Sequence, residues 1–107
     1  MEKIPPRLLE IFTIITKING TSGKEKDVAN YIMEFLSRLG FPVYEDDAGK
    51  KINGNCGNLI CKVGNGGDFI LLSHMDTARP TSKLEHNITK NRISSKSDTI
   101  LGADNRA

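Results

Sequence analysis

The residues of this sequence best suited to chemistry are His74 and Asp76, which follow an apolar run at residues 69–72. Residues two apart on a strand project from the same face, so an extended backbone would place the imidazole beside the carboxylate. Such a pair is typical of a metal site, in which one ring nitrogen binds the ion and the carboxylate fixes the tautomer. Zinc accepts nitrogen and oxygen ligands together. Taken alone, however, the pair more often marks an ordinary strand end whose polar side chains meet solvent.

A second candidate is Asp104, which follows the apolar residues Ile100 and Leu101 and the small residues Gly102 and Ala103. Two small residues let the backbone approach closely and aim a carboxylate into a site. The simpler alternative is a turn from a strand into a helix, with Asp104 as the N-cap. In isolation this segment also favours the simpler alternative.

The two segments are more specific when they are taken together. Residues 74–77 (His-Met-Asp-Thr) followed by residues 101–105 (Leu-Gly-Ala-Asp-Asn) resemble the co-catalytic zinc exopeptidases of the peptidase T, dipeptidase and glutamate carboxypeptidase superfamily. The N-terminal part is also similar, with a first helix followed by residues 21–25 (Thr-Ser-Gly-Lys-Glu). The resemblance covers essentially all 107 residues and is strongest to the peptidase T-like tripeptidases.

The resemblance implies a role for each of the three candidates. His74 matches a ligand of one metal ion, Asp76 the catalytic aspartate that orients this histidine, and Asp104 the carboxylate that bridges two ions. Two zinc ions roughly 4 Å apart share an activated water and stabilise both the attacking oxygen and the developing oxyanion. The implied cofactor is therefore zinc, with two ions in the complete enzyme.

The sequence also departs from the family pattern. It contains no Glu-Glu pair, and the family's further acidic ligand, final histidine and lid or dimerisation domain have no counterpart. The other histidine, His86, lies in a polar stretch that predicts a solvent-exposed loop. Asn105 and Arg106 replace an acid and a lysine that other members often carry. With only His74 and Asp104 as ligands, we expect weak zinc binding and negligible peptidase activity from this chain alone.

The function that the resemblance implies is a zinc-dependent aminopeptidase that releases N-terminal residues from short peptides, as a tripeptidase does. Zinc-bound hydroxide would attack the peptide carbonyl, with a glutamate outside these 107 residues as the general base. One alternative is a deacylase or carboxypeptidase of the same superfamily, which shares the metal centre and differs in its substrate pockets. The other alternative is a truncated, non-catalytic interaction module.

Two amphipathic helices are expected ahead of these segments. The proline pair at residues 5–6 suits a first helical turn, and residues 19–20 (Asn-Gly) suit a helix end. Ser22 and Glu25 form the reciprocal pattern of a capping box at the start of the second helix, and Gly40 fits a left-handed residue after its end. The apolar faces comprise Leu8, Phe12, Ile15 and Ile18 in the first helix and Val28, Ile32, Phe35, Leu36 and Leu39 in the second.

The rest of the chain predicts short strands. Residues 41–45 predict an edge strand, because Pro42 cannot donate a hydrogen bond, and residues 46–58 predict a turn region. Residues 59–63 and 68–73 flank a glycine-rich turn and predict a hairpin. Its second strand is apolar on both faces and is expected inside a sheet that is covered on both sides. Weaker strand candidates are residues 88–93 and 99–101.

These elements predict an α/β fold in which two helices are followed by a mixed sheet. Two helices are too few to cover both faces of that sheet, so residues 1–107 are expected to be the N-terminal part of a catalytic, metal-binding domain. An uncovered apolar face also predicts that the chain self-associates.

Composition excludes several classes of function. Charged residues make up 26% of the chain and the net charge is only +2, which gives no electrostatic case for binding nucleic acid or a membrane. The apolar runs are far shorter than the roughly 20 residues of a membrane span, and the N-terminus has no signal-peptide layout. A cytoplasmic protein is therefore expected, and the family resemblance implies a short peptide as its substrate. Cys56 and Cys61 lack the spacing of a zinc ribbon or redox pair and predict free thiols.

Overall fold

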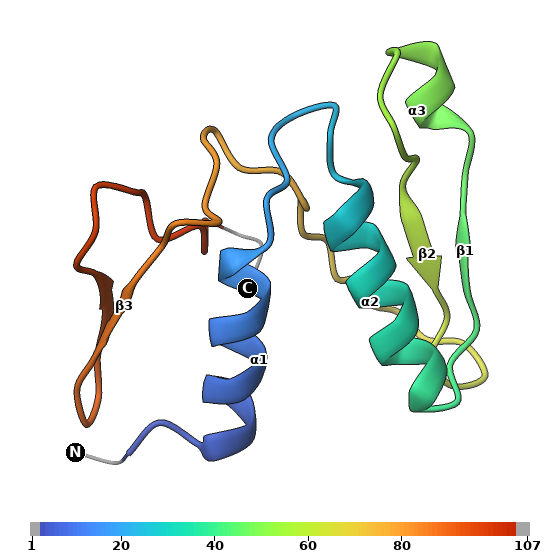
Figure 1. Ribbon diagram of the computed structural model, residues 1–107. Helices are drawn as coiled ribbons and strands as arrows, with labels where there is room; N and C mark the ends of the chain where they lie inside the picture. The colour runs from blue at the N-terminus through green and yellow to red at the C-terminus, as the bar shows by residue number, and fades with distance from the viewer. Residues whose placement is uncertain (1–2, 105–107) are drawn as a thin grey trace.

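A computed structural model describes residues 3–104 of the chain, and Figure 1 shows its helices and strands. The family differences expected at Asn105 and Arg106 lie outside the described residues. None of the described helices has the length and apolar composition needed to cross a membrane. In chain order the elements are α1 (Pro6–Lys17), α2 (Lys26–Arg38), β1 (Val43–Glu45), α3 (Ala48–Lys51), β2 (Leu59–Cys61), β3 (His86–Ile88) and β4 (Ile93–Ser95).

The two long helices lie where the apolar periodicity predicts them. α1 has a proline in its first turn and ends one residue before Ile18. α2 ends in a Schellman motif, in which the N–H of Gly40 donates to the Ser37 carbonyl (3.0 Å) and the N–H of Phe41 donates to the Leu36 carbonyl (3.0 Å). Gly40 has a φ of 87° and is the left-handed residue that the sequence predicts.

The start of α2 differs from the prediction. The helix begins at Lys26 with Glu25 as its N-cap residue, whose side chain makes no capping hydrogen bond, and the N–H of Lys26 donates to Oδ1 of Asn55 (3.0 Å). Ser22 lies outside the helix, and its hydroxyl donates to the carboxylate of Asp76. The predicted capping box is therefore wrong, because the serine that was to cap the helix binds a distant part of the chain.

The strands form two separate antiparallel pairs instead of one mixed sheet. β1 pairs with β2, which places Tyr44 opposite Ile60, and β3 pairs with β4. Within residues 3–104, the parallel pairing is an isolated bridge between Thr21 and Thr77. The α/β class is confirmed, whereas the mixed sheet is wrong because the segment expected at its centre stays unpaired.

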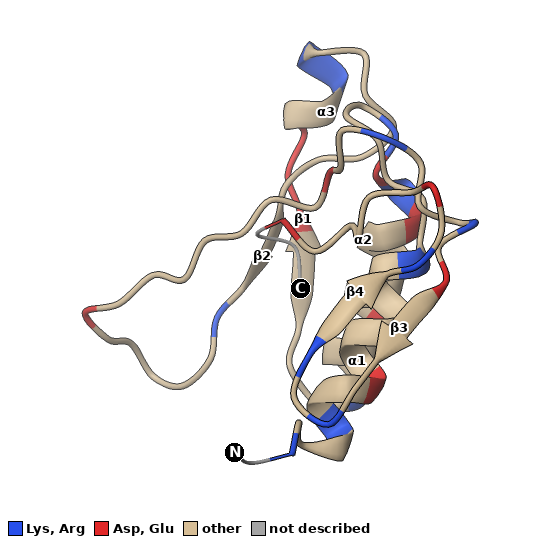
Figure 2. Cartoon of the chain, turned by 90° about the vertical axis from the view of Figure 1, so that its left-hand side faces the viewer, with Lys and Arg blue, Asp and Glu red and all other residues tan. Residues whose placement is uncertain are grey.

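That segment, residues 68–73, does not form the predicted hairpin with residues 59–63. β2 pairs with β1, and the apolar run belongs to an open loop that extends away from the helices at the left of Figure 2. The side chains from Phe69 to Leu72 are 83% to 97% exposed. A strand needs a hydrogen-bonding neighbour on at least one edge. Among the strands of the described region, none lies beside this run.

Two other predictions need correction. Residues 88–93 contain the turn between β3 and β4 instead of one strand, and residues 99–101 are not a strand. The predicted turn region at residues 46–58 contains the one-turn helix α3. Asp46 closes this region, because its carboxylate accepts hydrogen bonds from the backbone N–H (2.8 Å) and the side-chain amide (2.9 Å) of Asn58.

The buried residues of the small core come from α1, from α2 and from the segment of residues 77–84. The outer members of the predicted apolar faces, Leu8 and Leu39, are 56% and 49% exposed, so only the inner part of each face is buried. The buried apolar residues are Ile15, Val28, Ala29 and Leu84, and the buried polar residues are Thr16, Thr77 and Thr81.

Asn19 and Gly20, at the end of α1, hold the part of the chain that follows the candidate site. The side-chain oxygen of Asn19 accepts hydrogen bonds from the backbone N–H groups of Thr81 (2.7 Å) and Ser82 (2.8 Å). The N–H of Thr77 donates to the Gly20 carbonyl (2.8 Å). These bonds fix the backbone directly after the segment that carries the candidate histidine.

Candidate functional site

The three residues singled out in the sequence line one pocket. His74 and Asp76 lie in the long connection between β2 and β3, and Asp104 lies in the segment after β4. The structure therefore brings Asp104 to the pair of His74 and Asp76, which the sequence related to it only through the family resemblance. The pocket has a volume of about 610 Å³ and is also lined by Ser22, Thr77, Ala78, Ile100, Leu101, Gly102 and Ala103.

Asp76 orients the imidazole ring of His74. The Nδ1 atom of His74 lies 3.1 Å from Oδ1 of Asp76 and 3.0 Å from the Asp76 carbonyl oxygen. Both of these oxygens are acceptors, so the proton of a neutral ring resides on Nδ1 and the lone pair on Nε2. This is the tautomer in which a histidine binds a metal through Nε2 while a carboxylate holds its other nitrogen.

Asp76 is itself held in the ionised state. The Ser22 hydroxyl donates a hydrogen bond to Oδ2 of Asp76. This hydrogen bond, and then the nearby imidazole of His74, lower the pKa of Asp76 although partial burial opposes the shift. The carboxylate is therefore charged at neutral pH and accepts strongly from the ring N–H.

Asp104 follows a backbone turn that requires glycine. Gly102 is buried and has a φ of 75°, a conformation that side-chain-bearing residues rarely adopt. Asp104 comes two residues later, with an exposed side chain at the pocket. The alternative role of Asp104 as a helix N-cap depends on residues 105–107, which lie outside the part of the chain that the structure describes.

The donors in the pocket match zinc in kind but not in number. An imidazole nitrogen and a carboxylate are ordinary zinc ligands, and His74 and Asp104 line the same pocket. Across residues 3–104, no group of three or more histidine, cysteine, aspartate or glutamate side chains is arranged to hold a metal ion. Because a catalytic zinc takes roughly three protein ligands, the described residues supply only part of such a site.

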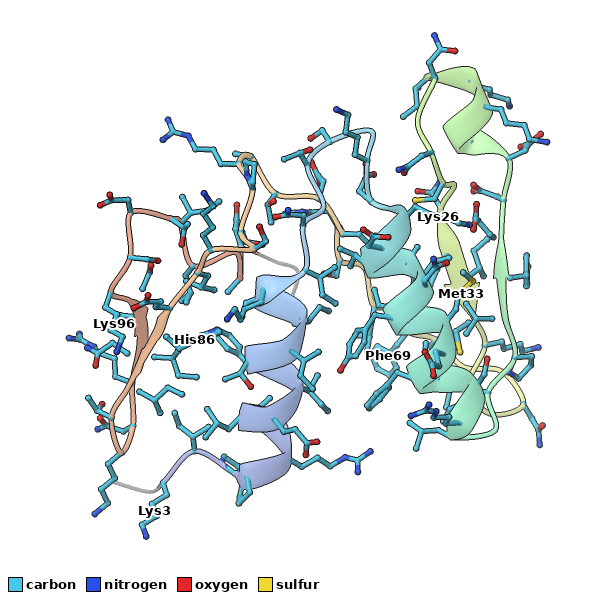
Figure 3. The ribbon with its side chains drawn as sticks, viewed as in Figure 1. Lys3, Lys26, Met33, Phe69, His86 and Lys96 are labelled. Carbon is cyan, nitrogen blue, oxygen red and sulfur yellow. The ribbon has the colours of Figure 1, made fainter. Side chains whose placement is uncertain are left out.

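His86 does not lie in a solvent-exposed loop as predicted. It belongs to β3, and its Nε2 lies 2.8 Å from the Thr16 hydroxyl of α1 (Figure 3). Burial lowers the pKa of His86, and the positive charge of Lys17 adds to this effect. His86 therefore packs β3 against α1, and it does not line the candidate pocket.

The cysteines contribute nothing to the pocket. Cys56 and Cys61 are free thiols, as predicted, and neither lines it. Burial raises the pKa of Cys56, and the carboxylates of Glu25 and Glu45 raise it further. The thiol of Cys56 is therefore protonated at neutral pH and a poor nucleophile.

Ser22 is the pocket residue that sequence reasoning assigned to another role. Its spacing to Glu25 fits a local capping box, and no local pattern places it beside Asp76. The available signal was the resemblance itself, because residues 21–25 belong to the opening that the chain shares with the exopeptidase family.

Comparison with known proteins gives relatives for nearly the whole chain. No protein-family model matches it. It is 34% identical over 104 residues to the uncharacterized protein YqjE of Bacillus subtilis (strain 168). The matched region covers 94% of this chain and 28% of YqjE. It is structurally similar to aminopeptidase PepT from Bacillus cereus ATCC 10987, with a TM-score of 0.84, 29% identity, and coverage of 97% of this chain and 29% of PepT. It is also similar to a tripeptidase from Staphylococcus aureus subsp. aureus Mu50, with a TM-score of 0.80, 30% identity, and coverage of 99% and 30%.

These matches concern one part of larger proteins. The chain has the fold of a portion of the aminopeptidase and tripeptidase structures, and it spans less than a third of the length of each protein that it matches.

Proposed function

We propose that this chain is the N-terminal, metal-binding part of a zinc-dependent aminopeptidase that releases N-terminal residues from short peptides, as a tripeptidase does. The similarity to an aminopeptidase and a tripeptidase over almost the whole chain supports the proposal. The single observation that carries it is the contact between His74 Nδ1 and Asp76, which leaves the Nε2 lone pair for a metal ion in a pocket that Asp104 also lines.

Each of the three side chains has a distinct task in this proposal. His74 binds the metal through Nε2, and Asp76 keeps the proton on Nδ1 and fixes the ring. Asp104 carries two carboxylate oxygens and so can bridge two ions. Bound zinc supplies Lewis-acid polarisation of the peptide carbonyl. The described pocket has no carboxylate left for a general base, and we assign that task to a glutamate outside residues 1–107.

The experiment uses the protein expressed from its complete reading frame, with Ala-Ala-Ala and N-acetyl-Ala-Ala-Ala as substrates. We expect release of the N-terminal alanine from the free tripeptide, loss of this activity with a chelator, and recovery with zinc. Release of acetate from N-acetyl-Ala-Ala-Ala would instead indicate a deacylase. Release of the C-terminal alanine from the same acetylated peptide would indicate a carboxypeptidase.

Matched histidine variants provide the control. His74→Ala removes a proposed ligand and should abolish activity, whereas His86→Gln changes the histidine that lies outside the pocket and should keep it. Activity that survives both chelation and His74→Ala contradicts the proposal.

For residues 1–107 alone we expect negligible turnover of Ala-Ala-Ala. The described residues offer no group of three or more metal-ligating side chains, and the pocket holds no spare carboxylate. Turnover is measured on the purified chain with and without zinc. Metal-dependent turnover that His74→Ala abolishes would overturn this expectation.

The exposed apolar loop favours a second candidate function, that of a non-catalytic interaction module. Phe69, Ile70, Leu71 and Leu72 are almost fully exposed, and an extended apolar segment can pair edge to edge with the same segment of a second copy. Such pairing would bury these side chains and satisfy their backbone groups without any chemistry in the pocket.

A further inference from the structure

We propose that Ser22 is a positioning residue of the candidate site, whose hydroxyl holds the Asp76 carboxylate in the orientation that meets His74. This inference rests on the proposed function for its catalytic meaning. It also assigns a role to the loop between α1 and α2. Neither the helix pattern nor the set of proposed metal ligands explains this loop.

The two oxygens of Asp76 have different partners. Oδ2 accepts the hydrogen bond of the Ser22 hydroxyl, and Oδ1 lies 3.1 Å from Nδ1 of His74. An aspartate side chain with only one partner can change its χ1 rotamer and turn about its terminal bond, whereas one held at both oxygens has a single rotamer and a fixed carboxylate plane. Because the Asp76 side chain is 35% exposed, water can solvate Oδ2 when the serine is absent, but water does not fix the plane.

The backbone sets the position of Ser22 relative to Asp76. The residues next to them, Thr21 and Thr77, form a parallel bridge. The N–H of Thr77 donates to the Gly20 carbonyl at 2.8 Å, and Thr77 is only 5% exposed. This bridge holds the two backbone segments close together at the residues directly beside Ser22 and Asp76. A short serine side chain is therefore long enough to reach Oδ2 of Asp76.

The loop that carries Ser22 is also anchored on its other side. The N–H of Lys24 donates to the Thr21 carbonyl (2.8 Å), and Gly23 has a φ of 85°, as position three of a type II turn requires. The N–H of Asn55, in the connection between β1 and β2, donates to the Gly23 carbonyl (3.0 Å). Ser22 is therefore held between two anchored neighbours.

The first arm of the test is nuclear magnetic resonance of the 107-residue chain at neutral pH. We expect three-bond couplings that report one χ1 rotamer for Asp76, and a nuclear Overhauser contact between the β protons of Ser22 and Asp76. In Ser22→Ala the Asp76 rotamers should average, and in Ser22→Thr the single rotamer should return. Ser37→Ala, at an exposed serine of α2, is the matched control and should resemble the parent chain.

A purely structural role for the hydroxyl predicts a different pattern. If Ser22 only stabilised the loop, Ser22→Ala would also speed hydrogen exchange at the Thr77 N–H, which is bonded to the Gly20 carbonyl. We expect that exchange rate to stay unchanged. An unchanged Asp76 rotamer in Ser22→Ala, or faster exchange at Thr77 that accounts for the averaging, overturns the inference.

The second arm measures peptidase kinetics of the protein from its complete reading frame. We expect Ser22→Ala to lower kcat about tenfold with KM nearly unchanged, and Ser22→Thr to restore kcat. Parental kinetics in Ser22→Ala would overturn the inference while the proposed function stands. Absence of peptidase activity in the parent protein would overturn the proposed function, and the rotamer measurement would still decide whether Ser22 positions Asp76.

Discussion

His74 and His86 are the same residue type in two different surroundings. The His74 side chain is 41% exposed at the pocket, and its Nδ1 faces the charged carboxylate of Asp76. His86 packs against α1, where its Nε2 meets the Thr16 hydroxyl, and no carboxylate within residues 3–104 forms an ion pair with it. The first arrangement suits a metal ligand, and the second makes protonation of the ring unfavourable.

The pH dependence of folding should therefore report His86. Its pKa is lowered in the folded chain, mainly by burial, so the unfolded chain takes up a proton first, near its ordinary value of about 6.5. The free energy of unfolding should then decrease as the pH falls from about 6.5 toward the folded-state pKa. Urea unfolding at pH 7.5 and pH 5.5 measures this. His86→Gln should flatten the dependence, and an equally steep dependence in that variant would contradict the assignment.

At the residue scale, the sequence singled out the candidate residues but did not predict the contacts around them. His74, Asp76 and Asp104 were singled out because their two short motifs together resemble those of the exopeptidase family, and the structure brings them to one pocket. The partner of Ser22 could not be found, because it depends on a contact with a residue 54 positions away. His86 was assigned to a solvent-exposed loop because its sequence neighbours are polar, although the fold places it against α1.

At the scale of elements, the helices and the strands β1 and β2 were predictable, whereas the pairing of the strands was not. The helix pattern and the Gly40 end signal are complete within a short stretch, so α1 and α2 needed no information from the rest of the chain. A strand exists only when another strand pairs with it. Residues 68–73 have a strong strand sequence and no partner in the described region, and they remain a loop.

The end of α2 allows a clean test of backbone conformation. Gly40 has a φ of 87°, and a Cβ built there would meet nothing within 4 Å. Gly40→Ala should therefore lower the free energy of unfolding by about 1 kcal/mol through the left-handed backbone alone. Gly67→Ala is the matched control, because Gly67 also has open space and is outside the left-handed region. Equal unfolding midpoints in urea for Gly40→Ala and Gly67→Ala would show that the left-handed glycine at the end of α2 contributes nothing to the free energy of unfolding.

At the scale of the whole molecule, the burial is uneven. The core consists of a few residues around α1, α2 and the segment that ends at Leu84, whereas four consecutive large apolar side chains stand in solvent. Exposed patches of this kind drive association.

We therefore expect the 107-residue chain to form dimers or larger species as its concentration rises. Leu71→Lys places a charge in the exposed run and should shift the chain toward monomer. Ile52→Lys changes an isolated exposed apolar residue and should have no such effect. Light scattering over a range of concentrations measures the mass, and a stable monomer at high concentration would contradict the expectation.

The metal centre itself is tested most directly by anomalous X-ray scattering from zinc in crystals of the protein expressed from its complete reading frame. We predict a zinc peak in the pocket, roughly 2.0–2.2 Å from Nε2 of His74 and from a carboxylate oxygen of Asp104. Asp76 should remain on Nδ1 of His74, with Ser22 on its other oxygen. A zinc-loaded crystal with no peak at His74, or with the metal on Nδ1 in place of Asp76, would contradict the proposed site.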